Sequence, residues 1–137
     1  MPIISIFSGG FCQEGTVIEE VVARTGYKRI SDDEIVAEAS RRSTLAEGKL
    51  RRAFSSKTSV FNKFTLEKER SLAYIKLAVA DLIADDNTLI KNFSGQLIPV
   101  TVSHTLRVCL IAPIKYRTEM AARQPGISEK DAAKLVQ

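Results

Sequence analysis

The sequence has few of the residues that several classes of protein require. It contains two cysteines, Cys12 and Cys109, in no C-x-x-C pair, and a single histidine. This set excludes a disulfide framework and argues against a structural zinc site or a histidine-based catalytic triad. No apolar run approaches the roughly 20 residues that cross a bilayer. No positive region precedes the apolar residues 2–7, so we expect no signal peptide, no membrane partner and a cytoplasmic location.

The chain has the length and composition of one globular domain, and its positive charge is concentrated in the middle. Of its 137 residues, 45% are hydrophobic and 26% are charged. Residues 41–76 contain ten lysines and arginines against three glutamates, a charge of +7 within a net charge of +4. Such a stretch favours an anionic partner, although a solvated charged face is the alternative. Nucleic acid is the disfavoured anion, because only Phe54, Phe61 and Phe64 accompany the charges as stacking residues.

The order of the expected strands and helices is typical of an α/β protein. Residues 3–7 predict a buried strand, and helical spacing predicts a helix from Thr16 to a stop at Gly26. Ser31 and Glu34 form a capping box for the next helix, which runs to about residue 42. The remaining predictions are a strand at 28–30, a loop with a broken helix at 43–64, a helix from 65, strands at 87–93 and 106–113 with an "SG" turn after the first, and helices at 114–124 and from 128. Together they predict one three-layer α/β domain over residues 1–137, with a mostly parallel sheet flanked by helices.

The loop "SGGFCQEG", which follows the first strand, is the candidate binding site. Ligands of such sheets bind beyond the carboxyl ends of the strands. A glycine-rich loop between a strand and a helix offers backbone N–H groups to phosphate, with the helix dipole behind them. The alternative is a tight turn whose glycines allow a positive φ or close packing. Glu14 at the start of the helix is more simply explained as an acid that favours the dipole.

Two stretches resemble the cytidylate-kinase-like family of nucleoside monophosphate kinases, which have the P-loop fold. The first, "IISIFSGGFCQEGTVIEEVVARTGYKRISDDEIV", has the strand, glycine-rich loop, helix ending in "GY" and acidic helix of that family. The second, "LRVCLIAPIKYRTEMAARQPGISEKDAAKLVQ", has its late strand, "AP" turn, arginine-bearing helix and "G-I-S-E-K-D-A" helix. The resemblance implies a kinase that transfers phosphate from ATP to a nucleoside monophosphate such as CMP, with Mg²⁺ required.

The resemblance also implies which residues bind ATP. The phosphates would be held by backbone N–H groups of the loop and by the start of the helix. The positions that match the family are Gly9, Gly10, Gly15 and Thr16. Thr16 would also be the ligand of Mg²⁺.

The residues for the acceptor and for the transfer step come from the same resemblance. Residues 41–70 would form a basic flap that binds the monophosphate, with Arg70 as the main phosphate ligand. Apart from the resemblance, the acidic residues 32–34 could include a ligand for Mg²⁺ or the acceptor ribose, with Asp33 as the candidate contact; helix capping and a favourable dipole interaction are the alternative. Arg117 and Arg123 lie where related kinases place arginines that neutralise the transferring phosphoryl group.

Three features depart from the family pattern and keep a second function open. The signature G-x-x-x-x-G-K-[ST] lacks its lysine, because Thr16 follows Gly15 directly, and an alignment on "TV" puts Glu14 at that place. The turn "KNFSG" lacks the arginine of the family's "GRG"-like turn. The lid segment is missing, which indicates a fragment of a longer protein or a minimal form without a lid. The alternative is therefore a catalytically inactive kinase-fold sensor or interaction module, with a second copy of the chain as a partner.

Overall fold

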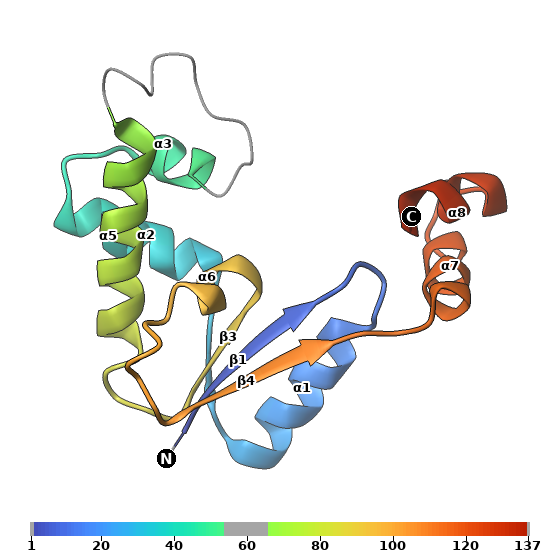
Figure 1. Cartoon of the computed structure of the whole chain (residues 1–137), viewed down its shortest axis with the longest axis horizontal. Coiled ribbons are helices and arrows are strands. Elements are labelled where there is room, and N and C mark those ends of the chain that lie inside the picture. Colours follow the sequence, from blue (N-terminus) through green and yellow to red (C-terminus); the bar gives the residue numbers. More distant parts are fainter. Residues whose placement is uncertain (1, 54–65, 137) are drawn as a thin grey trace.

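The computed structural model describes residues 2–53 and 66–136. Residues 54–65, which form the middle of the expected flap, lie outside the described part of the chain, as do Phe54, Phe61 and Phe64. Figure 1 shows the elements in their order. They are β1 (Ile3–Ser8), α1 (Glu14–Thr25), β2 (Lys28–Ile30), α2 (Asp32–Arg42), α3 (Glu47–Arg52), α5 (Glu67–Leu82), β3 (Thr88–Lys91), α6 (Asn92–Gln96), β4 (Thr105–Leu110), α7 (Ile114–Ala122) and α8 (Glu129–Val136).

The described strands form one four-stranded sheet in the order β2-β3-β1-β4, and every neighbouring pair is parallel. Strand β1 lies in the interior, with Ile6 opposite Lys91 of β3 on one side and Val108 of β4 on the other. Because all four strands run the same way, the segments that follow β1, β3 and β4 leave from the same edge of the sheet. The predicted α/β class with a parallel sheet is confirmed.

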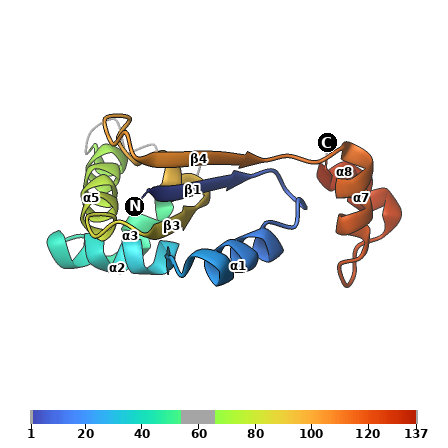
Figure 2. The same ribbon diagram turned by 90° about the horizontal axis from the view of Figure 1, so that it is seen from below.

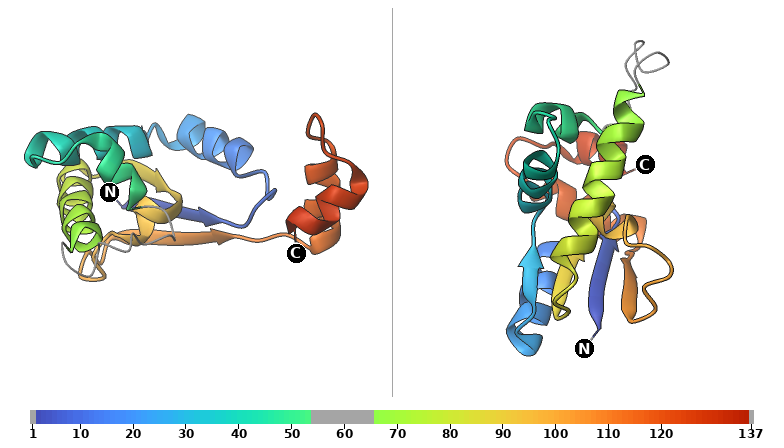
Figure 3. Two further views of the ribbon diagram at one scale, coloured as in Figure 1. Left: turned by 90° about the horizontal axis from the view of Figure 1, so that it is seen from above. Right: turned by 90° about the vertical axis from the view of Figure 1, so that its left-hand side faces the viewer.

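Helices cover both faces of the sheet. Successive side chains of β1 point to opposite faces, and apolar residues on both faces must be covered. Ile3 belongs to a buried cluster with residues of α2, α3 and α5, such as Ile35 and Ile75. Ile4, the next residue, belongs to a second cluster with Ile18 of α1. Figures 1 and 3 show the sheet between α1 on one side and α2, α3 and α5 on the other. The structure therefore has the three layers that the sequence predicts.

The last two helices stand apart from these layers. Figures 1 and 2 show α7 and α8 packed on each other beyond the carboxyl end of β4, at the opposite end of the molecule from α5. Their own small core contains Ala121, Ala132 and Val136, and Phe11 of the loop after β1 packs against it. The helix pair is thus held against the candidate loop. Within the described residues, no helix combines the length and apolar character that crossing a membrane demands.

Local signals explain where several helices begin and end. The N–H of Glu34 donates to Ser31 Oγ at 3.2 Å, and the N–H of Ser31 donates to Glu34 Oε2 at 2.8 Å. This confirms the capping box, and the backbone hydrogen bond from Ser31 is the main cause that lowers the pKa of Glu34. Gly26 ends α1 with a φ of 69° and donates its N–H to the carbonyl of Val22. The strand at 28–30 is also confirmed.

Two local predictions are wrong. Helix α1 begins at Glu14 rather than at Thr16, with Gln13 before it in the left-handed conformation at a φ of 58°. The expected strand 87–93 ends at Lys91, and the expected "SG" turn lies in the helix α6. Gly95 of α6 packs so closely on Ser5 of β1 that a Cβ would overlap its Oγ. Tertiary packing against the sheet therefore sets the conformation of this segment.

Candidate functional site

A cavity of about 500 Å³ lies at the carboxyl end of β1. It is lined by residues 8–15, by Asn92 at the start of α6, and by Met120 and Gln124 at the end of α7. This volume suits a small molecule. The cavity therefore lies where the sequence predicts it, and three segments that are distant in the sequence form its walls.

Several backbone N–H groups of the loop make no hydrogen bond within the described residues. The N–H of Gly9 donates to the carbonyl of Leu110 at 3.1 Å and so extends the pairing of β1 with β4. From residue 10 to residue 16, by contrast, no N–H donates to an acceptor within residues 2–53 and 66–136. These amides include the first turn of α1, where helix N–H groups have no partner within the helix. Unpaired N–H groups at a helix start, together with the helix dipole, favour negative charge.

The glycines of the loop leave this backbone uncovered. The loop residues with positive φ are Phe11 at 62° and Gln13 at 58°, whereas Gly9 and Gly10 are not in that region. A Cβ on Gly10 would come no closer than 3.9 Å to Arg117 Nη2, and one on Gly15 would meet nothing within 4 Å. A turn that requires glycine for its φ is therefore not the explanation. The space around Gly10 and Gly15 is therefore open enough for a Cβ.

Helix α7 is attached to the loop by polar contacts. Arg117 donates a hydrogen bond from Nε to the carbonyl oxygen of Gly10 at 2.8 Å. Gln13 Nε2 lies 2.9 Å from Met120 Sδ, and Phe11 packs on the α7–α8 core. These contacts bring the Arg117 guanidinium to the rim of the loop. Of the two predicted transfer-step arginines, Arg117 is the one the structure places there.

A lysine that the sequence analysis did not single out also lies at the loop. Lys91 Nζ is 3.5 Å from Oε1 of Glu14, and the two side chains are 27% and 30% exposed. Glu14 is the first residue of α1 and lines the cavity. The sequence carried a signal for this position. Side chains alternate along a strand, so pairing the strand that contains Lys91 in parallel with β1 would have placed Lys91 beside the end of β1.

The predicted acceptor residues lie away from the cavity. Asp33 is ion-paired with Arg51, Nη1 to Oδ1 at 2.6 Å, and this carboxylate raises the pKa of Arg51. Asp32 instead accepts a hydrogen bond from Ser94 Oγ of α6 at 2.6 Å. Arg70 is exposed in the first turn of α5, and Figure 1 shows this helix at the opposite end of the molecule from α7.

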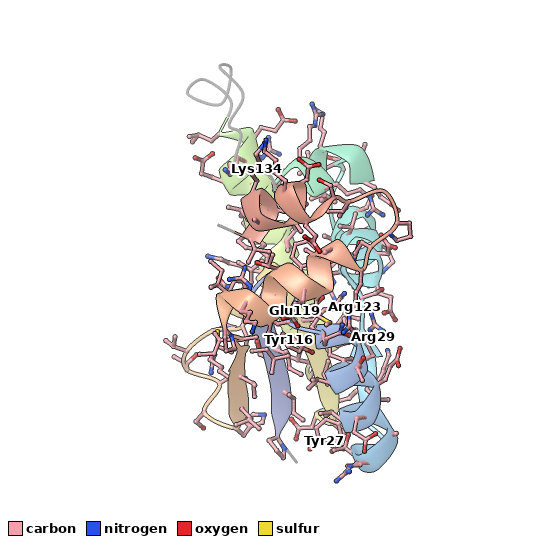
Figure 4. All side chains as sticks on the ribbon, turned by 90° about the vertical axis from the view of Figure 1, so that its right-hand side faces the viewer. Tyr27, Arg29, Tyr116, Glu119, Arg123 and Lys134 are labelled. Atoms are coloured by element: carbon pink, nitrogen blue, oxygen red, sulfur yellow. The ribbon has the colours of Figure 1, made fainter. Side chains whose placement is uncertain are left out.

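Arg117 is not among the residues that line the cavity, and neither are two further predicted residues. Arg123 is exposed at the end of α7, where Figure 4 shows it on the same helix as Glu119. Thr16 is exposed in the first turn of α1 and lies one residue beyond the cavity lining. Their roles stay predictions.

Most basic residues of the described part of 41–70 have acidic neighbours. Arg41 and Arg42 both bond to Glu38, and these hydrogen bonds lower the pKa of Glu38 to about 2. Lys49 Nζ lies 3.3 Å from Glu67. For α2 and α3 a solvated, ion-paired face therefore explains the charge. Arg70 has no carboxylate partner within the described ranges.

No group of three or more histidine, cysteine, aspartate or glutamate side chains gathers into a metal-binding cluster in residues 2–53 and 66–136. Mg²⁺ bound with a nucleotide does not require such a cluster, because phosphates and waters supply most of its ligands.

Comparison with known proteins shows what the chain is similar to. A model of the cytidylate kinase-like family matches residues 3–137. The chain belongs to the cytidylate kinase-like family. The residues that form the loop, the cavity and the α7–α8 pair all lie within the matched range.

One solved structure shows the same fold at low sequence identity, and a second gives a weaker match. An uncharacterized protein from Eubacterium ventriosum aligns with 98% of this chain and 71% of its own, at a TM-score of 0.66 and 12% identity. A protein from Thermus thermophilus aligns with 97% of this chain and 78% of its own, at a TM-score of 0.45 and 17% identity. None of the curated proteins matches the chain significantly.

Proposed function

We propose that this cytidylate kinase-like domain binds ATP at residues 8–15 and transfers its γ-phosphoryl group to a nucleoside monophosphate, of which CMP is the simplest. The supporting observation is the run of backbone N–H groups from residue 10 to residue 16, which have no acceptor within the described residues. They lie at the amino end of α1 and beside a cavity of about 500 Å³. We place the activity in the cytoplasm, because the two free cysteines fit a reducing compartment.

The loop would hold the phosphates and Arg117 would act on the transferring group. Phosphoryl transfer depends on positioning and on neutralising the charge of the phosphoryl oxygens. Arg117 uses Nε for the carbonyl of Gly10. Its guanidinium has five N–H donors in a planar fork, so the two terminal nitrogens remain for phosphate oxygens. The bond to Gly10 therefore orients the fork.

One side chain of the site, that of Thr16, could serve as a ligand of Mg²⁺. The Thr16 hydroxyl, exposed in the first turn of α1, has no hydrogen-bond partner among the described residues. It would hold the ion together with phosphate oxygens and water. When bound, Mg²⁺ neutralises negative charge on the phosphates.

The acceptor would bind on the α2–α5 side of the sheet. Arg70, exposed and without a carboxylate partner in the described part of the chain, remains the residue we assign to its phosphate. Because Arg70 does not line the cavity, transfer requires that the acceptor phosphate and the γ-phosphate are brought together when both nucleotides are bound. Asp33 is paired with Arg51, so a contact with the acceptor requires that this exposed pair opens. Exposed ion pairs contribute about 0–1 kcal/mol, which a bound nucleotide readily offsets.

One observation favours the second function, an inactive kinase-fold sensor or interaction module. The Glu14 carboxylate lines the cavity, and the loop itself contains no lysine. A carboxylate beside the β- and γ-phosphates repels them in a partly desolvated site. A sensor would bind nucleotide weakly and without turnover.

A melting screen followed by a turnover assay distinguishes the two functions. The melting temperature is measured with ATP and Mg²⁺, with CMP, and with both, and ADP release is then measured with and without CMP. A kinase is stabilised by ATP and releases ADP only when the acceptor is present. Stabilisation by ATP without ADP release supports the sensor. If no nucleotide raises the melting temperature, nucleotide binding at this loop is overturned.

A further inference from the structure

The phosphate loop of this chain contains no basic residue. In the signature G-x-x-x-x-G-K-[ST], the lysine between the second glycine and the hydroxyl residue reaches the β- and γ-phosphates. Here Thr16 follows Gly15 directly. Arg117 contacts the other end of the loop, at Gly10. The end next to α1 therefore requires a cation from another element.

Strand β3 brings a lysine to that end. Strand β3 lies beside β1, with Lys91 opposite Ile6. Side chains alternate between the faces of a sheet, and Leu89, two residues before Lys91, is buried with Ile18 of α1. Lys91 therefore projects on the α1 side of the sheet. Asn92, the residue after it, lines the cavity.

The ammonium group of Lys91 lies at the first turn of α1. Its Nζ is 3.5 Å from Glu14 Oε1, at the long end of the range for a hydrogen bond. Both side chains are less than one third exposed, at 27% and 30%. An ammonium group has three donors, and Glu14 is its one ion-pair partner in the described residues. A phosphate with more negative charge is a stronger acceptor than this carboxylate.

We propose that Lys91 supplies the phosphate-binding ammonium group of this site from β3, and that Glu14 holds it at the loop until a phosphate replaces the carboxylate. The inference rests on the proposed binding of ATP and assigns the cation for it. The charge that the loop lacks is thereby provided by the neighbouring strand. Glu14 becomes the positioning residue of that cation.

A simpler role for Lys91 is to cancel the charge of Glu14 without touching the ligand. A double-mutant cycle separates the two roles, because neutralising Glu14 removes the need for cancellation but leaves the need for a phosphate ligand. The cycle consists of the wild-type chain, Lys91→Met, Glu14→Gln and the double variant. Neither Lys91 nor Lys134 is among the residues that line the cavity, and the control is Lys134→Met on α8, an exposed lysine without an ion-pair partner in the described residues (Figure 4).

The measurement is the Kd of ATP with Mg²⁺ by titration calorimetry, with circular-dichroism melting of each free variant as the folding check. We expect Lys91→Met to weaken binding by about ten- to a hundredfold, the range for a hydrogen bond to a charged group. We expect the loss to persist in the Glu14→Gln background. Lys134→Met should bind as wild type. Lys91→Gln replaces Lys91→Met if the latter does not fold.

Three other outcomes would overturn either the role of Lys91 or the binding of ATP. Equal binding by Lys91→Met and wild type overturns the role of Lys91 and leaves ATP binding intact. A loss that disappears in the Glu14→Gln background shows that Lys91 only cancels Glu14, which also overturns the direct contact. No ATP binding by either the wild type or Glu14→Gln overturns the proposed function itself, and the role of Lys91 with it.

Discussion

The Arg117 side chain donates a hydrogen bond from Nε to the main-chain carbonyl of Gly10 at 2.8 Å. This single contact joins α7 to the loop after β1, 107 positions apart in the sequence. A guanidinium that is held at one nitrogen keeps its orientation while its other nitrogens remain free for a ligand. The predictions below begin from this contact.

Replacing Arg117 should affect the transfer step more than ATP binding. We expect Arg117→Lys to lower kcat by about a hundredfold or more, the usual loss when one donor to the transition-state charge is removed. A lysine keeps the charge but cannot bond to Gly10 and to a phosphate with one planar group. Steady-state kinetics with ATP and CMP measure the effect. Lys115→Ala, also exposed on α7, is the control and should leave kcat unchanged. Equal losses in both variants would argue against the assignment.

A carboxylate at Gly10 should abolish ATP binding without unfolding the domain. Gly10 has no positive φ, and a Cβ there meets only Arg117, so the fold accommodates the substitution. The new charge of Gly10→Asp would lie among the N–H groups that face the ligand and would repel phosphate. Gly10→Ala is the control, because it adds the Cβ without the charge. The Kd of ATP and the melting temperature of the free protein are measured; unchanged ATP binding by Gly10→Asp would refute the loop assignment.

The contact between Asp32 and Ser94 should stabilise the fold. Ser94 is fully buried, and its hydroxyl donates to Asp32 at 2.6 Å, which joins the start of α2 to α6. We expect Ser94→Ala to lower the free energy of unfolding by about 1–3 kcal/mol, since a charged acceptor loses its donor. Urea denaturation measures the change. Ser103→Ala, at an exposed position, should change stability by less than about 0.5 kcal/mol. A similar stability for both variants would show that the contact contributes little.

The capping box predicts a pH dependence of stability. The pKa of Glu34 is lowered from 4.5 in the folded protein, so its carboxylate stabilises the fold above pH 4.5 and loses this effect as the pH falls through the lower folded value. Glu34→Gln should therefore lower the free energy of unfolding by about 0.3–1 kcal/mol at pH 7. The difference from wild type should shrink in acid. Urea denaturation at a series of pH values tests this, with Glu19→Gln, exposed within α1, as the control. A difference that stays constant with pH would contradict the assignment.

Local signals in the sequence were sufficient for the fold and for the position of the site. A short, continuous apolar run identifies β1, the S-x-x-E pattern identifies the start of α2, and Gly26 identifies the end of α1. Each of these depends on residues within one turn or one strand. The loop between β1 and α1 follows from them, and the cavity lies there.

Other features depend on packing between distant segments and could not be predicted from local signals. Asp32 and Asp33 are neighbours in the first turn of α2, so they point in directions about 100° apart. The burial of Ile35 and Val36 fixes the rotation of α2 on the sheet. This rotation determines that Asp32, and not Asp33, points toward α6. The approach of Lys91 to Glu14 requires the strand order β3-β1. A stretch such as "NFSGQ" becomes a helix because Gly95 fits against Ser5.

Phe11 combines two properties that link the cavity to the C-terminal helices. It belongs to the loop, with a φ of 62°, and its ring packs on Ala121 and Ala132. A bulky residue in the left-handed region is strained, and surrounding contacts must hold it there. The loop therefore cannot change its backbone conformation without releasing this ring, and releasing the ring removes part of the small core between α7 and α8. A rearrangement of the loop backbone would therefore disturb the packing of those two helices through one aromatic side chain.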